Sequence, residues 1–421
     1  MADSTTTRMP AVETPRKLRR LRAQRSAPTG DRQPALLLGG GIVALSVGRR
    51  LAQLGIPVVG LGHSSDPLRY SRHRSEFVDT GSGDRVQDRW LHWLEGGPRR
   101  GVVLPCSDDA LELVARNRPR LVELGYSPVE ADDEVLLAML DKAQTAELAR
   151  MAGVDIPRTA VVSRGQLLPE VIDGFSFPCA LKPRESHLFA HHYGMRQKLF
   201  VVQTLAEMES RLANLPAELQ MIATEIVPGP DRFCSYYSYI DEHGGPLFHY
   251  TKQKLRQFPT RFGLGTYHCS DWNPEVAEQG LRFMQAVGLR GLGNVEFKRD
   301  SRDGRLKLIE CNHRFTAANS LVQACGVDVA QLAYNRALGL PGPTIDGYRR
   351  GLHLWAPVED MRAFAQYRRS GEMSATEWLR SLAGPQRLAV GSLRDPRPGF
   401  VAARGVTTRV ARQAVAGILS R

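Results

Sequence analysis

Two acidic residues and an asparagine, Glu296, Glu310 and Asn312, are the side chains whose types and spacing point most directly to chemistry. Residues 293–312 have the pattern of a β-hairpin, and a turn centred near Asp303 places Glu296 directly across from Glu310. Asn312, two residues further on, shares their face. Two carboxylates and an amide oxygen on one face suit a hard cation such as Mg²⁺, which also takes phosphate and water oxygens. The alternative is a solvated sheet face that carries both acids.

The opposite face of this hairpin is predicted to be apolar. Val295, Phe297 and Ile309 alternate with the polar residues along the two strands. We therefore expect these three side chains to point into a core.

Two lysines could bind phosphate groups. Lys142 follows Asp141 in a predicted helix, 136–151, and Lys182 ends a short apolar strand, 177–183. A lysine at a strand end, with its stem packed and its ammonium in a cleft, suits a polyphosphate. Each lysine taken alone is equally compatible with a solvent-exposed side chain.

A third segment has features of a nucleoside site. The predicted strand 221–227 carries Glu225 and runs into a Pro–Gly break that is followed by Asp231. Exposed backbone at such a break can hydrogen-bond the edge of an adenine, and a nearby carboxylate can accept hydrogen bonds from ribose hydroxyls.

A basic segment, residues 250–263, follows this break. If it is extended, Lys252, Lys254 and Arg256 lie on one side and present a positive face to a phosphate or to a carboxylate substrate. The alternative is a solvated strand face.

The elements that must position these residues begin with a predicted βαβ unit. Its strand, glycine turn, helix and second strand cover residues 35–38, 39–41, 44–54 and 56–61, and another strand follows at 101–105. A parallel sheet with crossover helices explains this pattern. The glycines also allow a nicotinamide dinucleotide site, although no acidic residue ends the second strand; the alternative is a turn that needs glycine for close backbone approach.

The order of these motifs resembles the ATP-grasp superfamily, and within it the carbamoyl-phosphate-synthase-like ligases, a group that includes D-aspartate ligases. The matching motifs are Asp141-Lys142, Lys182-Pro183, Thr224–Gly229, Val295–Phe297 and Ile309–Phe315. The resemblance covers roughly residues 35–340, and its last strand is the most specific part. It implies an α/β (α+β) chain with an ATP-grasp fold, preceded by a Rossmann-like parallel-sheet pre-ATP-grasp domain.

The resemblance also implies a role for each matched residue. The residues implied to hold ATP are Lys142, Lys182, Glu225, Ile226, Val227 and Asp231. Those implied to bind Mg²⁺, or Mn²⁺ in its place, are Glu296, Glu310 and Asn312. Those implied to assist the chemistry are Arg314, Lys252, Lys254 and Arg256.

Two departures from the ATP-grasp pattern stand out. Asp231 lies where glutamate is commoner, and the loop 184–194 is poorer in glycine than many phosphate loops of these enzymes. The loop contains three histidines whose spacing fits no zinc motif, so we expect a mobile lid there rather than a metal site.

The implied reaction is ATP-dependent activation of a carboxylate as an acyl phosphate. An amine then attacks to form an amide or peptide bond, with release of ADP and phosphate. The alternatives are an ATP-grasp carboxylase or thioester-forming ligase, an NAD-linked enzyme, and a non-catalytic nucleotide-binding protein.

These motifs divide the chain into four expected segments. They are a disordered basic tail at 1–34, the pre-ATP-grasp domain at 35–132, the ATP-grasp domain at 133–345 with subdomains at 133–228 and 229–345, and a C-terminal extension with a basic amphipathic helix at 346–421.

Net charge and composition limit the kinds of binding partner that the sequence predicts. The net charge of +12 on 421 residues resides almost wholly in the two ends, since residues 1–34 carry +5 and residues 385–421 carry +6. The body is near neutral, so no specific nucleic acid is expected; its partners are a small-molecule carboxylate and amine, with the oligomeric state left open. Scattered cysteines and the lack of a long apolar run favour a cytoplasmic protein whose basic ends could touch an acidic partner or a membrane surface.

Overall fold

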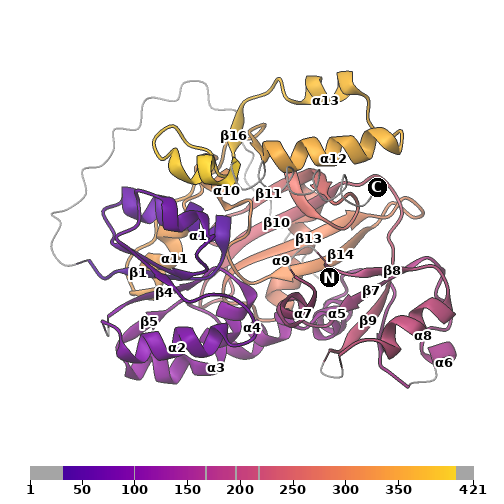
Figure 1. Ribbon diagram of the computed structural model, residues 1–421, viewed down its shortest axis with the longest axis horizontal. Helices are drawn as coiled ribbons and strands as arrows, with labels where there is room; N and C mark the ends of the chain where they lie inside the picture. Colours follow the sequence, from indigo (N-terminus) through magenta and orange to yellow (C-terminus); the bar gives the residue numbers. More distant parts are fainter. Residues whose placement is uncertain (1–31, 99, 166–167, 195–196, 217–218, 404–421) are drawn as a thin grey trace, which may run out of the picture. The chain divides into compact units, whose positions relative to one another are not determined.

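The computed structural model describes residues 32–98, 100–165, 168–194, 197–216 and 219–403 (Figure 1). Its first part is a five-stranded parallel sheet in the order β3-β2-β1-β4-β5. The strands are β1 Ala35–Leu38, β2 Val58–Gly62, β3 Glu76–Asp79, β4 Gly101–Pro105 and β5 Tyr126–Pro128. The helices are α1 Gly41–Gln53, α2 Val86–Gly96 and α3 Asp108–Glu123, with a 3₁₀ turn, η1, at Pro67–Tyr70. The predicted Rossmann-like domain is therefore confirmed.

The glycine turn between β1 and α1 is needed for backbone approach. Gly40 has φ 93°, and a Cβ placed there would lie 2.3 Å from the Cβ of Cys106 at the end of β4. A side chain at this position would meet both a left-handed backbone and a steric clash. The turn therefore fits the close-approach interpretation of the three glycines.

A four-stranded antiparallel sheet follows, in the order β6-β9-β7-β8. Its strands are β6 Thr159–Val162, β7 Cys179–Pro183, β8 Phe200–Val202 and β9 Met221–Glu225. The helices of this region are α4 Asp133–Leu140, α5 Lys142–Met151, α6 Leu168–Val171, α7 Ser186–Tyr193 and α8 Leu205–Ala213. Alternate residues, such as Leu181 and Ala223, enter a core with α8, while Lys182 and Thr224 face a cavity on the other side.

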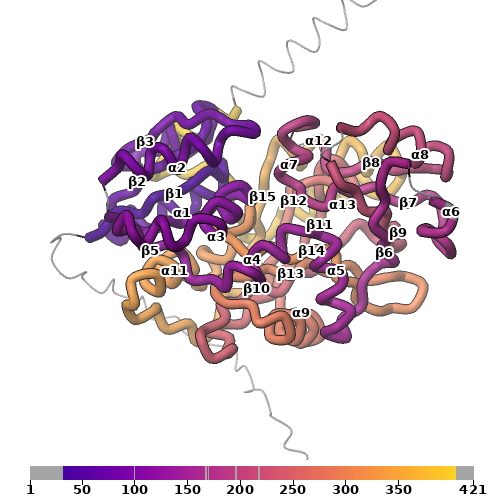
Figure 2. Tube along the Cα trace, turned by 90° about the horizontal axis from the view of Figure 1, so that it is seen from below, coloured from indigo at the N-terminus to yellow at the C-terminus, as the bar shows by residue number. Residues whose placement is uncertain are grey.

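The largest sheet has seven strands in the order β14-β13-β10-β11-β12-β15-β16. They are β10 Phe233–Ile240, β11 Tyr250–Phe258, β12 Leu264–Asp271, β13 Gly291–Arg299, β14 Leu306–Asn312, β15 His353–Trp355 and β16 Gln386–Leu388. Its helices are α9 Pro274–Ala286, α10 Asn319–Ala324, α11 Val329–Ala337, α12 Pro357–Arg369 and α13 Ala375–Ser381. Helices α4 and α5 lie against β14, which brings the lysine at the start of α5 next to the carboxylates of the hairpin (Figure 2).

The expected division at residue 345 does not separate two sheets. β15 pairs with β12, and β16 pairs with β15, so residues up to 388 belong to the large sheet. Further along, Asp395 accepts hydrogen bonds from Ser71 Oγ and Arg49 Nε, at 2.7 and 2.9 Å, and so ties this segment to the parallel-sheet domain. These pairings join residues far apart in the chain, which local sequence patterns cannot reveal.

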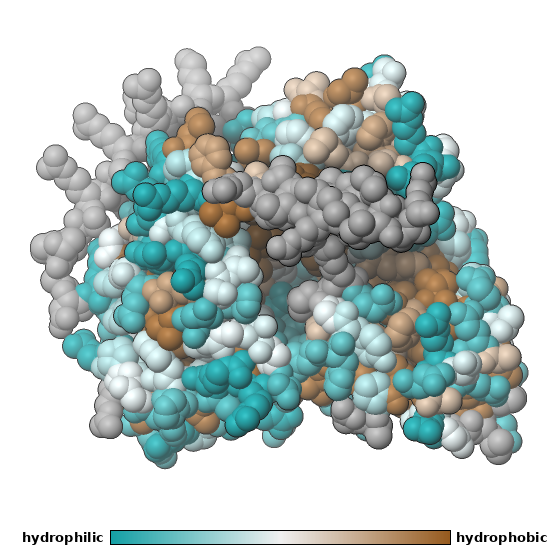
Figure 3. Space-filling view, viewed as in Figure 1, coloured by the Kyte–Doolittle hydropathy of each residue, from teal (hydrophilic) through white to brown (hydrophobic). Residues whose placement is uncertain are grey.

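Two expectations about the ends of the chain lie outside the described residues. They are the disordered tail, apart from its last residues, and the amphipathic helix near 407–420. Among the residues that are described, no helix is both long enough and apolar enough to cross a membrane. Hydrophilic and apolar residues are intermixed on the face shown in Figure 3. Met361 of α12 and Leu379 of α13 are among the exposed apolar side chains.

Candidate active site

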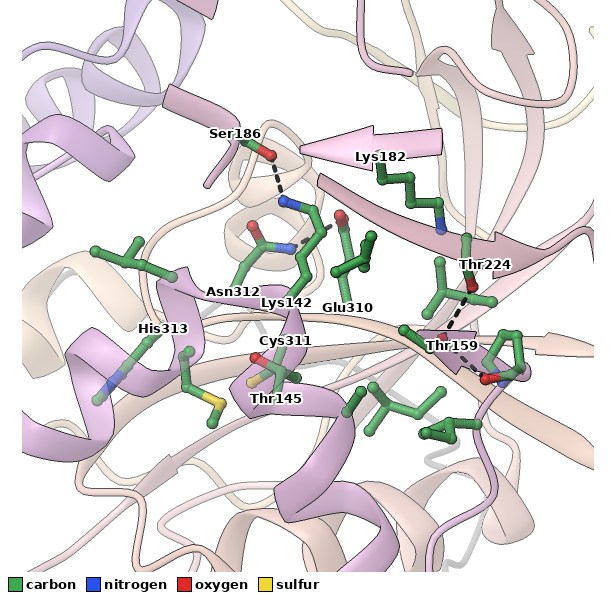
Figure 4. Close-up of a pocket in the computed structure, with 18 of the residues that line it drawn as sticks. Lys142, Thr145, Thr159, Lys182, Ser186, Thr224, Glu310, Cys311, Asn312 and His313 are labelled. Carbon is green, nitrogen blue, oxygen red and sulfur yellow. Dashed lines mark hydrogen bonds between the residues drawn. The ribbon is translucent and has the colours of Figure 1, made fainter. Parts of the chain in front are cut away.

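A cavity lies between the four-stranded sheet and β14 of the large sheet, and the empty space there, open solvent included, is about 770 Å³. One part of its wall is apolar, with Ile156, Ile222 and Leu308. The polar part of its wall comprises Asp108, Lys142, Thr159, Lys182, Ser186, Thr224, Glu310 and Asn312, most of which Figure 4 labels.

The β13–β14 hairpin has the predicted register at its acidic pair. Glu296 is the direct partner of Glu310, and Asn312 Nδ2 donates a hydrogen bond to Glu310 Oε1 at 3.0 Å (Figure 4). Val295 and Phe297 are fully buried, as expected. The expectation for Ile309 is wrong, because the register shifts after Glu296 and Phe297 pairs with Leu308. Ile309 is the extra residue of this β-bulge and lines the cavity instead.

A row of polar side chains continues from this pair across the large sheet. Ser235 is registered with Glu296 on one side and with Lys252 on the other, and Lys252 Nζ donates to Ser235 Oγ at 2.9 Å. Two residues along β11, Lys254 Nζ lies 2.9 Å from Glu296 Oε1 and 4.1 Å from the centre of the Phe233 ring. The structure therefore brings Lys252 and Lys254 together with the two carboxylates.

The Glu310 carboxyl is held ionised by the surrounding cations. Burial opposes its ionisation, but the charges of Lys198, Lys254 and Lys142 and the hydrogen bond from Asn312 outweigh burial and lower its pKa to about 2. The glutamate is therefore a carboxylate across the physiological range.

Four lysines of the site have lowered pKa values, because burial disfavours their charged form. Burial lowers the pKa of Lys182 to about 8, and the nearby charge of Lys142 adds to this effect. Burial likewise lowers the pKa of Lys252 to about 8, with Lys254 adding to the effect, and lowers the pKa values of Lys142 and Lys198. Because these cations outnumber the two carboxylates among them, the site is suited to a polyanion.

Lys198 is a site residue that the sequence analysis missed. It lies just before β8, and it is among the groups that lower the Glu310 pKa. A lysine in a loop between two elements has no periodic or motif signal, so only the tertiary fold reveals its neighbours.

Lys142 is fixed by the start of α5. Asp141 caps this helix, with its carboxylate accepting from the backbone of Ala143 at 2.8 Å, and it also forms an ion pair with Arg184. The ammonium of Lys142 donates to Ser186 Oγ at 2.7 Å (Figure 4). The Asp-Lys pair of the sequence thus combines a helix cap with a cation that points into the cavity.

Arg314 connects the large sheet to the parallel-sheet domain. Its Nε donates to Asp108 Oδ1 at 2.6 Å, at the first residue of α3. The Arg314 charge, together with the hydrogen bond, outweighs burial and lowers the pKa of Asp108. The arginine follows Glu310 and Asn312 directly along the chain, so it enters the site from the same strand end.

Arg256 does not join this cluster. The pairing of β11 with β12 is irregular on both sides of Arg256, so the regular alternation that predicted a shared face fails there. Its Nε and Nη2 each donate to Asp360 at 2.8 Å, and its Nη1 donates to Ser381 at 2.8 Å. With only 2% of its side chain exposed, Arg256 holds α12 and α13 to the sheet. This corrects the expectation that it faces a substrate.

The residues expected around the nucleoside lie beside the cavity rather than in its described wall. Glu225 ends β9 and forms an ion pair with Arg302. Asp231 accepts hydrogen bonds from Arg261 N at 2.7 Å, from the Gln257 side chain and from Tyr367 Oη. The backbone of Ile226 and Val227 follows directly on Thr224 and Glu225, of which Thr224 lines the cavity.

The donor set fits Mg²⁺ with phosphate. Among the described residues no group of three or more His, Cys, Asp or Glu side chains comes together as a metal site. Mg²⁺ in phosphate-transferring sites is held by one or two carboxylates together with substrate phosphates. Glu296 and Glu310, opposed on neighbouring strands beside the Asn312 amide, match that requirement.

A Rossmann-like domain followed by an antiparallel sheet and a mostly antiparallel one, around a lysine-rich, carboxylate-bearing cavity, is the arrangement of the ATP-grasp fold. A family model described as carbamoyl-phosphate synthase L chain, ATP binding domain, matches residues 271–344. D-aspartate ligase from Enterococcus faecium (strain Aus0004) is 24% identical over 243 residues, which are 55% of this chain and 58% of the ligase. The chain thus spans less than two thirds of that relative.

Solved structures show the same fold. An L-amino acid ligase from Bacillus licheniformis has a TM-score of 0.55 and 16% identity, with coverage of 73% of this chain and 75% of that one. The biotin carboxylase domain of Hydrogenobacter thermophilus 2-oxoglutarate carboxylase, solved with MgADP and bicarbonate, has a TM-score of 0.59 and 18% identity, covering 76% and 73%. The predicted fold is confirmed: this chain has the ATP-grasp fold.

Proposed function

We propose that the chain is an ATP-dependent ligase that activates a carboxylate as an acyl phosphate and joins it to an amine. ADP and phosphate are the other products. The observation that carries this proposal is the cluster of Glu296 and Glu310 among five lysines, of which Glu296, Lys252 and Lys254 are buried, with Arg314 just after the same strand. Such a cluster is suited to binding a triphosphate and to stabilising charge during phosphoryl transfer.

In this proposal the nucleotide occupies the cavity between the sheets. Lys142, Lys182 and Lys198 bind its phosphates, because all three surround Glu310 from the side of the four-stranded sheet. The apolar wall and the backbone after β9 take the adenine. Asp231 already accepts from three donors, so a ribose hydroxyl would share oxygens that are in use.

Glu296, Glu310 and Asn312 would hold the metal. When bound there, Mg²⁺ or Mn²⁺ supplies neutralisation of charge on the phosphate oxygens. Asn312 orients the Glu310 carboxylate through its amide, and Lys254 orients that of Glu296. Arg314, held by Asp108 through Nε, would stabilise the transferring phosphoryl group.

The experiment that tests this function is an ADP-release screen with MgATP and pairs of carboxylates and amines, D-aspartate among them. The expected result is a pair for which ADP release depends on both partners and matches formation of an amide detected by mass spectrometry. ADP release that needs only bicarbonate would instead support a carboxylase, and a thiol acceptor would support a thioester-forming ligase. A protein that binds MgATP but turns over with none of these would contradict the proposal.

The affinity for MgATP should fall as the pH rises through about 8. The pKa of Lys182 is lowered to about 8 by burial, so the free protein loses this cation above that pH, whereas a solvent-exposed lysine would keep its charge. The measurement is MgATP binding by calorimetry between pH 7 and pH 9.5. Lys182→Met should bind weakly at pH 7 and show a flatter profile; an unchanged profile would remove Lys182 from the phosphate site.

A further inference from the structure

The segment that was expected to be a mobile lid contains a short helix, α7. Its first residue, Ser186, lines the cavity and accepts the hydrogen bond from the ammonium of Lys142 (Figure 4). Lys142 Nζ also lies 3.4 Å from the backbone oxygen of Arg184, just before the helix. The position of α7 therefore determines where one of the proposed phosphate-binding lysines is held.

Two histidines fasten α7 to α3 of the parallel-sheet domain. His187 Nε2 lies 3.0 Å from Glu112 Oε2, and His191 Nε2 lies 2.9 Å from Asp109 Oδ1. The histidines are four residues apart on α7, and the acids are three residues apart on α3, so each set forms one face of its helix. His187 is 5% exposed, which makes its contact the interior one.

Glu112 is itself held in place. Gln87 of α2 donates to its Oε2 at 2.7 Å, and Arg116 donates to its Oε1 at 2.8 Å. A carboxylate fixed by two further donors provides a rigid anchor for the histidine. One turn earlier on the same helix, Asp108 holds Arg314. The first turns of α3 thus hold both the helix beside Lys142 and the arginine of the site.

The two histidines do not form a metal site. Each contacts a different carboxylate, and their ring centres are 6.3 Å apart in an edge-on arrangement. Among the described residues no cluster of three or more metal-binding side chains is present. Their role is therefore in fastening one helix to another.

We propose that Glu112 and His187 are positioning residues that fasten α7 to α3 and thereby hold Ser186 and Lys142 where the nucleotide phosphates bind. The proposal rests on the proposed function only for the identity of the ligand as a nucleotide. His191 and Asp109 form the second, more exposed fastening of the same helix. Loss of the inner contact frees α7 and weakens nucleotide binding without removing any group that touches the reacting atoms.

The charges around His187 give this contact a pH dependence. The groups that face it are Asp108, Asp109 and Glu112 of α3 and His191 of its own helix, with Lys142 near Asp108. Burial opposes the charged form of His187, but the hydrogen bond that His187 donates to Glu112 and the charges of the three carboxylates outweigh it and raise the pKa of His187 above its ordinary value. The ion pair is therefore complete at lower pH and weakens as the pH rises through that raised pKa.

The test measures MgADP binding and hydrogen exchange of residues 186–193 in the full chain. His187→Ala and Glu112→Ala should each raise the Kd for MgADP at least about tenfold and speed exchange in α7. His187→Gln should restore Kd to within about threefold of the parent, because its amide still donates to Glu112. It should also remove the part of the pH dependence of Kd that comes from His187, while the fall in affinity above about pH 8 that comes from Lys182 remains. Glu123→Gln, at the far end of α3, is the control and should change neither measurement.

Several outcomes overturn the proposal. They are unchanged Kd and exchange in both loss variants, an equal effect of the control, or a His187→Gln protein as weak as His187→Ala. If an inner-contact variant does not fold, His191→Ala provides the same readouts from the outer fastening, with a smaller rise in Kd expected and no change contradicting the proposal. MgADP binding needs neither carboxylate nor amine. A chain that binds the nucleotide but makes no amide would therefore contradict only the proposed function, and not the positioning role of Glu112 and His187.

Discussion

Glu310→Gln should lower MgATP-dependent ADP formation by at least about 100-fold while the protein stays folded. The substitution keeps the size of the side chain and its contact with Asn312, but it removes the negative charge that Lys142, Lys198 and Lys254 surround. A neutral amide cannot bind a divalent cation as a carboxylate does, so the charge of the phosphates is no longer neutralised. The measurement is initial ADP release at saturating MgATP with a productive substrate pair.

The matched control for this variant is Asp303→Asn. Asp303 lies in the turn of the same hairpin, where it pairs with Lys307 at 3.3 Å on the surface. It should leave activity within about twofold, because an exposed ion pair contributes little. Raising the Mg²⁺ concentration should rescue Glu310→Gln only in part. Full turnover by Glu310→Gln at ordinary Mg²⁺ would show that Glu310 is not a metal ligand.

The acidic pair itself was predictable from sequence because it depends on local geometry. Counting outward from Asp303 placed Glu296 opposite Glu310, and the structure has that register. The parallel sheet was predictable for a similar reason, since strand, glycine turn and helix follow one another within a few residues. The count missed the β-bulge at Ile309, because a single extra residue leaves no signal in an alternating sequence pattern.

The parts that sequence analysis missed depend on contacts between distant segments. The partner of Arg256 is Asp360, which is 104 residues away, and Glu112 and His187 are 75 residues apart. Lys198 acts on Glu310 from a distant part of the chain. A basic side chain on a strand has the same sequence pattern whether its partner is a substrate or a buried carboxylate, so strand alternation and the family resemblance assigned Arg256 to the wrong group.

Arg256→Met should lower the free energy of unfolding by about 3 kcal/mol, because it leaves the buried carboxylate of Asp360 without its ion-pair partner. Asp360 keeps hydrogen bonds from Thr266, Trp355 and Trp378, at 2.9, 3.1 and 3.0 Å, which places the expected loss at the lower end for a broken buried pair. The measurement is equilibrium unfolding in denaturant.

The ADP-forming activity of the folded variant distinguishes a structural role of Arg256 from a catalytic one. The folded fraction of Arg256→Met should retain ADP formation within about threefold, since its guanidinium is occupied by Asp360 and Ser381. Lys254→Met is the matched comparison two residues earlier on β11. It removes the cation that lies 2.9 Å from Glu296, so it should lose activity, and it should lose less stability than Arg256→Met because Lys252 still attracts the Glu296 carboxylate. If Arg256→Met is as stable as the parent but inactive, Arg256 acts on the substrate, and the ion pair with Asp360 is not what fixes α12 and α13 to the sheet.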